Sequence, residues 1–383
     1  MTRPTEAVIS AAKASAGNMA DRNTPFVFDE WYVAARSSEI GRALLPRTLL
    51  GKQVVLYRTL EGQVVALDDR CVHRSYPLSA GTLDDDTVIC GYHGFRYDAK
   101  GDLVEVPSQE RCPRGLGVHR YPVREIGPLV WIYMDPAGEP LAEPPSEASL
   151  DLSRWALSHG YLRLNGNYVS LHENLLDLTH LTYVHAKSFG TPDYAKAPFE
   201  ASVNEGRYAV RRHVVPTTLP PVWAEPTGIS SSTAARVATS TFVAPGLHEV
   251  QVTFYESTLP AAERTLFTIR TLHLPTPESH SSTHYFIVHC RDFGLDDAAM
   301  TQLMHERLFT AFREDVQALE LLEDTLRNAG DPFFEISVAS DRASVEMRKY
   351  LKRRVRARAA VRISFSGPDK PSGEIVRRTC LNQ

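Results

Sequence analysis

The sequence contains few cysteines, no long apolar run and no excess of basic charge, and each absence excludes a class of protein. Only five of the 383 residues are cysteine, and they are widely scattered, which argues against a disulfide framework and for a reducing cytoplasm. No apolar run approaches the roughly 18 residues that a membrane span requires, and residues 1–25 lack the apolar stretch of a secretory signal. The net charge of −4 gives no general electrostatic basis for binding nucleic acid or an anionic membrane.

The length and composition indicate a globular protein with two domains. Hydrophobic residues make up 43% of the chain, which is enough for a substantial core, and the length exceeds that of one compact core. Residues 26–145 alternate short β-segments with turns and predict an all-β domain, whereas residues 1–25 are expected to be a weakly ordered tail. A stretch rich in Pro, Ala and Glu at 135–149 predicts a linker, and residues 146–383 form the second domain.

The second domain is expected to combine a sheet with helices, so the fold class is α+β. Alternating segments between residues 207 and 289 indicate a broad antiparallel sheet. Helices are expected over residues 173–184, 296–328 and 340–361.

The basic C-terminal segment has two interpretations. Met347, Leu351 and Val355 recur every four residues, which predicts an amphipathic helix with a solvated basic face. A nucleic-acid tail and a docking site for an acidic reductase are the alternatives.

The most informative motif is a pair of mixed Cys and His ligands. Cys71 and His73 lie two positions apart, and Cys90 and His93 lie three apart. A [2Fe–2S] cluster whose two irons take different ligands needs two thiolates and two imidazoles. Zinc also accepts two Cys and two His, but its usual motifs pair Cys with Cys and His with His. The mixed order favours a Rieske cluster over a zinc site.

A second constellation follows at Asp177, His180 and His185. On an ideal helix, His180 and His185 would project about 140° apart, so both can bind one ion only if the helix is locally widened or ends near His185. Two histidines on a helix are ordinary when isolated. Downstream of a Rieske motif, they indicate a mononuclear iron site of the 2-His-1-carboxylate class, to which the cluster delivers electrons.

The helix at 296–328 offers the carboxylate. Asp315 lies in an apolar stripe that also contains Leu308, Phe312, Leu319 and Leu322. A buried carboxylate without a partner is costly, so Asp315 should bind the metal; pairing with an Arg or a backbone donor is the alternative. The neighbouring Glu314 is predicted to face solvent and to be dispensable.

Motifs, spacing and order together resemble the oxygenase components of the vanillate O-demethylase and dicamba monooxygenase group of Rieske non-haem iron oxygenases. The resemblance implies a Rieske domain joined to a helix-grip catalytic domain, in which an antiparallel sheet wraps around a long helix. It also implies site residues: Cys71, His73, Cys90 and His93 for the [2Fe–2S] cluster, His180, His185 and Asp315 for Fe(II), Asp177 as the electron-bridging carboxylate, and Asn174 beside the iron.

The implied activity is that of a terminal oxygenase. It would use O₂ and NAD(P)H electrons, delivered by a separate flavin or ferredoxin-type reductase, to hydroxylate or demethylate a small aromatic substrate. A homotrimer would place the cluster of one subunit beside the iron of the next, with Asp177 accepting hydrogen bonds from His180 and from the neighbour's His93. A ring cis-dihydroxylating dioxygenase is the first alternative, and a pure Rieske electron carrier, with two irons per chain instead of three, is the second.

The substrate pocket is the least predictable part of the site. His284, Phe286 and Asn174 are candidates for its lining or for the surroundings of the iron. Arg211 or Arg212 is a candidate partner for a substrate carboxylate, although solvated strand arginines are commoner.

Overall fold

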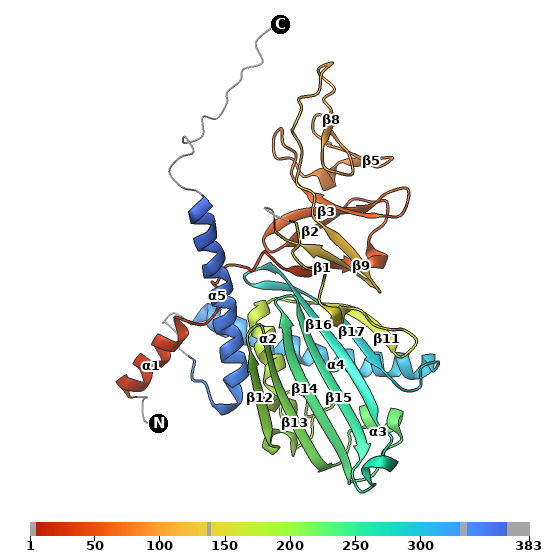
Figure 1. Cartoon of the computed structure of the whole chain (residues 1–383), viewed down its shortest axis with the longest axis vertical. Helices are drawn as coiled ribbons and strands as arrows, with labels where there is room; N and C mark the ends of the chain where they lie inside the picture. The colour runs from red at the N-terminus through yellow and green to blue at the C-terminus, as the bar shows by residue number, and fades with distance from the viewer. Residues whose placement is uncertain (1–4, 136–138, 330–334, 366–383) are drawn as a thin grey trace.

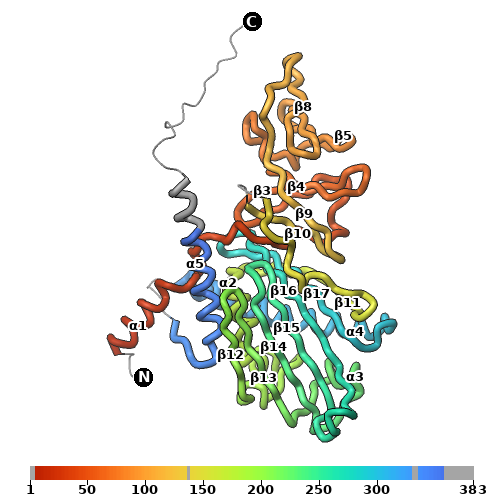
Figure 2. Tube along the Cα trace, viewed as in Figure 1, coloured from red at the N-terminus to blue at the C-terminus, as the bar shows by residue number. Residues whose placement is uncertain are grey.

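The computed structural model describes residues 5–135, 139–329 and 335–365, and the surroundings of side chains up to residue 357. Figure 1 shows small sheets at one end of the molecule and a broad sheet with helices at the other, and Figure 2 shows the same division along the chain trace. The fold is therefore α+β, with an N-terminal all-β domain and a second domain built around a large sheet, as predicted.

Three small antiparallel sheets form the N-terminal domain. The sheet containing β5 lies farthest from the large sheet in Figure 1. Gly62 has a φ of 81° and lets the chain turn tightly between β3 and β4. The sheets contain β1 (Trp31–Arg36), β10 (Leu129–Tyr133) and β9 (Val123–Ile126); β2 (Leu45–Leu49), β3 (Lys52–Arg58) and β4 (Val64–Asp68); and β5 (Thr82–Asp84), β6 (Thr87–Ile89), β7 (Arg96–Tyr97) and β8 (Leu103–Glu105).

Seven strands form the large sheet, in the order β11-β17-β16-β15-β14-β13-β12, and every neighbouring pair is antiparallel. Because side chains alternate along a strand, each strand offers one set of residues to the helices that cover one face. The strands are β11 (Ala156–Leu164), β12 (Phe199–Asn204), β13 (Arg207–Thr217), β14 (Ala234–Ala244), β15 (Leu247–Glu256), β16 (Phe267–Ser279) and β17 (Ser282–Arg291).

The long helix α4 packs its apolar stripe onto this sheet. Leu308, Phe312 and Leu319 are buried in one hydrophobic cluster with sheet residues such as Ile269. Leu322 is exposed, so the stripe ends earlier than predicted. The helices are α1 (Glu6–Ala16), α2 (Tyr168–Leu176), α3 (Pro221–Thr227), α4 (Ala298–Asn328) and α5 (Arg342–Phe365), with short 3₁₀ turns η1 (Ser37–Glu39), η2 (Leu78–Ala80), η3 (Ser146–Ala148), η4 (Leu178–Thr182), η5 (Tyr194–Lys196), η6 (Ala261–Glu263) and η7 (Ala339–Asp341).

Helix α4 approaches the sheet most closely at β11. A Cβ atom on Gly160 would lie 2.3 Å from the ring of Phe309. Glycine is therefore required here, because a side chain would push the helix off the sheet.

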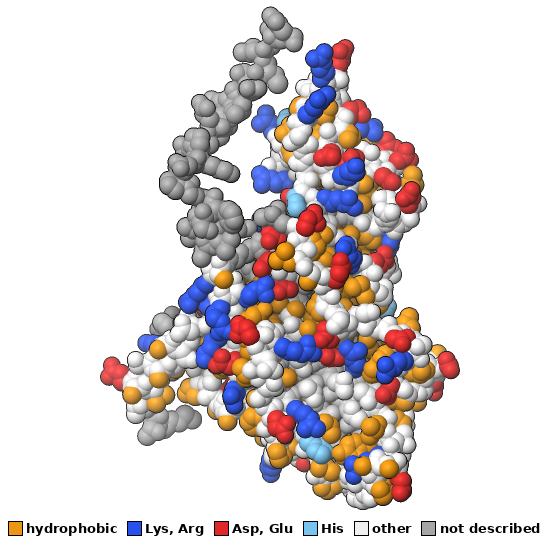
Figure 3. Space-filling model, in the orientation of Figure 1, with side chains coloured by type: hydrophobic (Ala, Val, Ile, Leu, Met, Phe, Trp, Pro, Cys, Tyr) orange, Lys and Arg blue, Asp and Glu red, His pale blue; other side chains and the backbone are white. Residues whose placement is uncertain are grey.

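The C-terminal helix α5 is amphipathic, as predicted. Met347 and Leu351 are fully buried, and Val355 packs against the same cluster. Figure 3 shows basic and acidic side chains interspersed over the visible face. No helix in the described ranges is long and apolar enough to cross a membrane.

Two segments differ in secondary structure from the sequence expectations. The helix expected at 173–184 is interrupted at Asp177, where α2 ends and η4 begins. Within the expected tail, residues 6–16 form α1, and Ala20 is buried, with its backbone N–H donating to the carbonyl oxygen of Arg348 at 2.9 Å. Arg348 and Arg356 of α5 also donate hydrogen bonds to the carbonyl oxygens of Ala20 and Gly17, contacts that sequence patterns do not reveal.

Candidate active site

The two loops that carry the predicted cluster ligands share one backbone design. The backbone N–H of Ser75 donates to the carbonyl oxygen of Cys71 at 3.0 Å, and that of Gly94 donates to Cys90 at 3.0 Å. Ser75 and Gly94 both have positive φ, at 60° and 74°, which closes each turn tightly. The structure thus brings the two Cys/His pairs together as matching turns.

The four side chains are suited to a cluster with two different ends. The thiols of Cys71 and Cys90 are buried, whereas His73 and His93 are exposed, with ring centroids 4.5 Å apart. A [2Fe–2S] cluster held by these residues would have its thiolate end inside the domain and its imidazole end at the surface. A partner could then approach the imidazole end for electron transfer.

Tyr97 contacts the thiolate end. Its hydroxyl oxygen lies 3.1 Å from Cys71 Sγ and accepts a hydrogen bond from Val72 N–H at 3.2 Å. Hydrogen bonds to cluster sulfurs raise the reduction potential. We therefore expect Tyr97→Phe to lower the potential in an EPR-monitored redox titration while the Rieske line shape persists. An unchanged potential would show that the hydroxyl does not act on the cluster.

The second constellation converges on one point. Asp315 Oδ1 lies 3.0 Å from His185 Nε2 and 3.4 Å from His180 Nε2, and the three potential ligand atoms lie within 4.8 Å of one another. Metal–ligand bonds of about 2.1 Å at right angles would put neighbouring ligand atoms about 3 Å apart. The three residues therefore fit a facial set of ligands around one divalent ion.

The interruption at Asp177 explains how residues five apart can converge. Asp177 caps η4 by accepting the backbone N–H of Thr179 on Oδ1 at 2.9 Å. The backbone carbonyl oxygen of Asp177 also contacts His180 Nδ1. Within the described chain, the backbone carbonyl of Asp177 rather than its carboxylate holds this imidazole, and it leaves Nε2 facing Asp315. The role of the carboxylate as an electron bridge between subunits stays a prediction.

Asn174 also lies beside the triad. Its side-chain Nδ2 donates to Asp315 Oδ1 at 2.9 Å. Both imidazoles face this same oxygen atom, so the hydrogen bond from Asn174 helps to fix the orientation of the Asp315 carboxylate.

Glu314 is the main correction to the predicted site. It was expected to face solvent, but its Oε2 accepts a hydrogen bond from His185 Nδ1 at 2.8 Å and one from the Ser188 hydroxyl at 2.6 Å. The segment after η4 folds back over α4 and covers this position. Glu314 therefore orients the imidazole of His185, as carboxylates often do for metal-binding histidines.

The electrostatics of the triad favour a cation. Burial by itself raises the pKa of Asp315, but hydrogen bonds and charges from His180 and His185 outweigh it and hold that pKa below its usual range. Burial lowers the pKa of His185, but Asp315 and then Glu314 raise it above its usual range overall. The site therefore retains an ionised carboxylate and attracts positive charge, which a divalent metal would supply.

We expect Glu314→Gln to weaken the binding of the mononuclear metal by about 10–100-fold, because a carboxylate behind a ligating imidazole strengthens and orients it. Retention of iron during dialysis against a chelator measures the effect. The matched control is Gln317→Ala, which changes an exposed residue about one turn further along α4. Wild-type retention in the Glu314 variant would restore the original prediction that this residue is dispensable.

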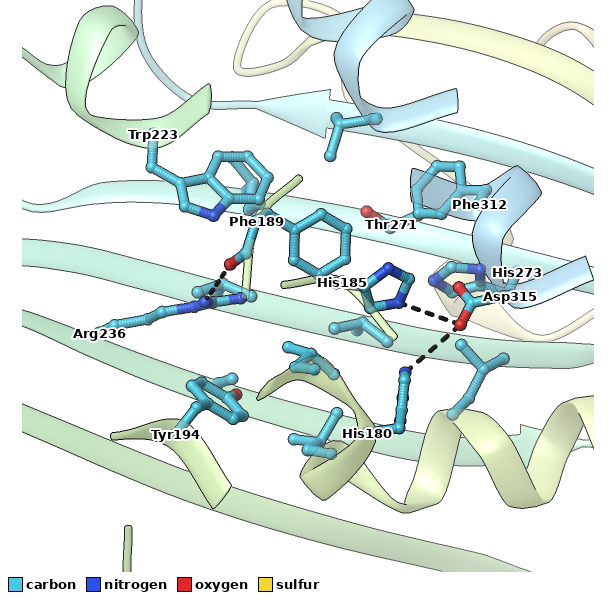
Figure 4. Close-up of a pocket in the computed structure, with 18 residues that line it drawn as sticks. His180, His185, Phe189, Tyr194, Trp223, Arg236, Thr271, His273, Phe312 and Asp315 are labelled. Carbon is cyan, nitrogen blue, oxygen red and sulfur yellow. Dashed lines mark hydrogen bonds and ion pairs between the residues drawn. The ribbon is translucent and has the colours of Figure 1, made fainter. Parts of the chain in front are cut away.

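A pocket opens from the triad. Figure 4 shows the triad at one side of it and Arg236, Tyr194 and Trp223 at the other, with the ring of Phe189 between them. The pocket is lined by Leu175, Leu178, His180, Leu181, His185, Phe189, Tyr194, Trp223, Arg236, Ala238, Val250, Val252, Ile269, Thr271, His273, Leu308, Phe312 and Asp315.

The predicted pocket residues His284 and Phe286 lie outside this lining, so that prediction is wrong. His284 contacts Tyr161 and Thr48, and Phe286 belongs to a separate apolar cluster. Arg211 lies within 3.7 Å of the Glu200 carboxylate.

Sequence patterns did contain a signal for Arg236, which was missed. On β14 it alternates with Ala234 and Ala238, which are both buried in the cluster that contains the α4 stripe. An arginine in register with small buried residues points into the interior.

Comparisons with known proteins identify the class of protein to which this chain belongs. Residues 30–122 match the Rieske [2Fe-2S] domain, and residues 164–357 match the vanillate O-demethylase oxygenase C-terminal domain. The chain is 32% identical over 330 residues to a putative toluene-4-sulfonate monooxygenase system iron-sulfur subunit of Comamonas testosteroni, covering 80% of this chain and 90% of that one. The protein is thus a Rieske non-haem iron oxygenase component.

Two further relatives define the family. The dicamba O-demethylase oxygenase component of Stenotrophomonas maltophilia is 32% identical over 308 residues, covering 78% of this chain and 88% of that one. A crystal structure of dicamba monooxygenase bound to 3,6-dichlorosalicylic acid matches with a TM-score of 0.80 at 28% identity, covering 88% and 99% of the two chains. The chain belongs to the vanillate O-demethylase oxygenase family. It uses a Rieske [2Fe–2S] cluster, non-haem iron and electrons from a separate reductase.

Proposed function

We propose that this oxygenase hydroxylates, or O- or N-demethylates, a small aromatic compound beside an Fe(II) ion held by His180, His185 and Asp315. The observation that carries the proposal is that the three ligand atoms converge at one side of a largely apolar, aromatic-lined pocket. When bound, Fe(II) would supply O₂ activation through its open coordination positions. Relatives named for toluene-4-sulfonate and dicamba support an aromatic substrate.

The residues of the chain orient the ligands and the substrate. The Asp177 carbonyl and the Glu314 carboxylate accept hydrogen bonds from the Nδ1 atoms of His180 and His185 and so aim both Nε2 atoms at Asp315. The apolar pocket walls exclude water and provide surfaces against which an aromatic ring can pack. If a hydroxylated methyl group is attached to oxygen or nitrogen, the product releases formaldehyde.

Electron delivery is proposed to occur between subunits of a ring, with a trimer as the expected form. Figure 1 places β5 and its neighbouring loops at the end of the molecule away from α2 and α4. Transfer within one chain would have to cover this separation. A head-to-tail ring places the His93 edge of one subunit against the Asp177 surface of the next, and its contacts close on themselves.

Two exposed apolar surfaces support this assembly. Beside the cluster ligands, Val72 and Tyr92 are exposed. Near the iron ligands, Leu322 is exposed and lines a surface groove with Asp177 and Asn174. Burying both surfaces at one interface would remove apolar area from water.

We also propose a cytoplasmic location. Cys71, Cys90, Cys112 and Cys290 are free in the described part of the chain, which suits a reducing compartment. Cys380 lies outside the described residues.

Turnover with a compatible reductase tests the proposed reaction. Aromatic compounds carrying methyl, methoxy or N-methyl groups should consume O₂ and NAD(P)H in equal amounts. Formaldehyde should appear only with the methoxy and N-methyl compounds, and the methyl compounds should give alcohols. A cis-diol would instead identify a ring dioxygenase, and electron transfer without substrate-dependent O₂ uptake would identify a carrier.

A further inference from the structure

Arg236 is a buried arginine that lines the pocket opposite the triad. Its side chain is on β14, and only 2% of the residue is exposed. In the described part of the chain, the one hydrogen bond that its guanidinium donates runs from Nη1 to the carbonyl oxygen of Phe189 at 3.0 Å. It forms no ion pair there, and its Nε has no hydrogen-bond partner. A buried guanidinium with so few acceptors is costly unless a ligand supplies them.

Two neighbouring side chains share this deficit. Among the residues that the structure describes, the buried hydroxyl of Tyr194 and the buried indole N–H of Trp223 have no hydrogen-bond partner, and both residues line the same pocket. The Arg236 guanidinium carbon lies 4.6 Å from the centroid of the Tyr194 ring. Figure 4 shows all three residues gathered at the side of the pocket away from the triad. Buried polar groups normally have partners, so three orphans at one place indicate a ligand rich in acceptors.

The adjacent buried arginine provides a comparison. Arg212, on β13, is also 2% exposed, but it donates to the carbonyl oxygens of Tyr194 and Ala197 and to the Thr179 hydroxyl. Its Nε also lacks a partner among the described residues, but both of its Nη atoms donate hydrogen bonds, and it does not line the pocket. Arg212 therefore secures the chain around η5, whereas Arg236 keeps hydrogen-bonding capacity for a ligand.

Among the described residues, the positive charge at this position is balanced only by aromatic rings and by Asp193 at a distance. Burial lowers the pKa of Arg236 from its ordinary value, while Tyr194 and Asp193 act in the opposite direction. Asp193 does not form an ion pair with it among the described residues. Most of the other pocket walls are apolar, including Val250, Val252 and Ile269, and they offer few partners for a water molecule.

We propose that Arg236, with Tyr194 and Trp223, binds the anionic group of the substrate, a carboxylate or sulfonate on an aromatic ring. This inference rests on the proposed function and specifies its substrate class. With the anion held at Arg236, the ring lies along Phe189, and the substituent on the far side of the ring faces the triad. Arg236 then selects both the substrate and the carbon that reacts, because a guanidinium pairs with two oxygens of such a group in a fixed geometry.

Binding to the anaerobic holoenzyme, measured by calorimetry, tests this proposal without turnover. The probes are 4-methylbenzoate against 4-methylbenzamide, and 4-toluenesulfonate against 4-toluenesulfonamide. We expect at least one acid to bind at least 10-fold more tightly than its amide, and the tighter acid identifies the group. Arg236→Met should abolish this preference by weakening only the acid, Arg236→Lys should retain part of it, and the matched control Arg212→Lys should leave it unchanged.

Three outcomes would overturn the proposal: equal binding of acid and amide by the wild type, no binding of either acid, or a preference that survives Arg236→Met. The wild-type comparison needs no variant to fold. Because the triad metal could also attract an anion, the preference should persist after mononuclear iron is removed by chelation. Failure of the proposed reaction is a separate result, seen as absent O₂ uptake, and leaves the binding preference measurable.

Discussion

Replacing Asp315 by alanine is expected to remove the mononuclear iron and abolish turnover while the [2Fe–2S] cluster remains. Asp315 Oδ1 is the point on which His180 Nε2 and His185 Nε2 converge, and it supplies the only negative charge of the ligand set. Two neutral imidazoles alone hold Fe(II) weakly. Iron content should fall from three to two atoms per chain, with an unchanged Rieske EPR signal.

The matched control for this variant is Asp324→Ala, which removes an exposed carboxylate from the same helix. It should keep three irons and full turnover. If Asp315→Ala also kept three irons, the carboxylate would have to be assigned elsewhere.

Replacing Asp177 by asparagine is expected to reduce turnover by about 100-fold or more while both metal centres and the oligomer remain. In the described chain, the Asp177 side chain accepts one hydrogen bond, from the backbone N–H of Thr179, and so caps η4. Asparagine caps a helix about as well as aspartate, so a purely capping role predicts no loss. A bridge in which the carboxylate accepts an N–H from the neighbouring subunit's His93, while the Asp177 carbonyl holds His180, needs the carboxylate charge. Oxidation of the pre-reduced cluster by O₂ and substrate in a single turnover measures the difference.

Mixing variants tests whether that bridge lies between subunits. Asp177→Asn keeps an intact cluster, and His93→Ala keeps an intact Asp177. In randomly mixed rings, about a quarter of the interfaces would pair an intact cluster with an intact Asp177. Activity should therefore return to about that level. No recovery, with confirmed mixed assemblies, would place electron transfer within one chain.

The convergence of the proposed metal ligands could largely be predicted, because its signals are local. The mixed Cys/His order needed only spacing and ligand chemistry, and the buried position of Asp315 followed from helical phase. The interruption at Asp177 was harder to predict, because the residues on both sides continue a helical pattern. The cap on Thr179 and the packing of the following segment decide where α2 ends.

The surroundings of the ligands were less predictable for a physical reason. Helical phase correctly separated Glu314 from the apolar stripe, but it could not show that Ser188 and His185 would fold over that side. Arg236 required the orientation of β14 and the position of the pocket, both of which depend on the assembled sheet. Contacts between distant segments, rather than local propensity, determine these parts of the site.

The most direct test of the central claim is ⁵⁷Fe Mössbauer spectroscopy of the reduced holoenzyme. A Rieske oxygenase with iron at His180, His185 and Asp315 predicts a cluster signal and a separate high-spin Fe(II) signal in a ratio of about two to one. The Fe(II) signal should disappear in Asp315→Ala. A wild-type spectrum that contains only cluster iron, with zinc or no metal at the triad, would contradict the account.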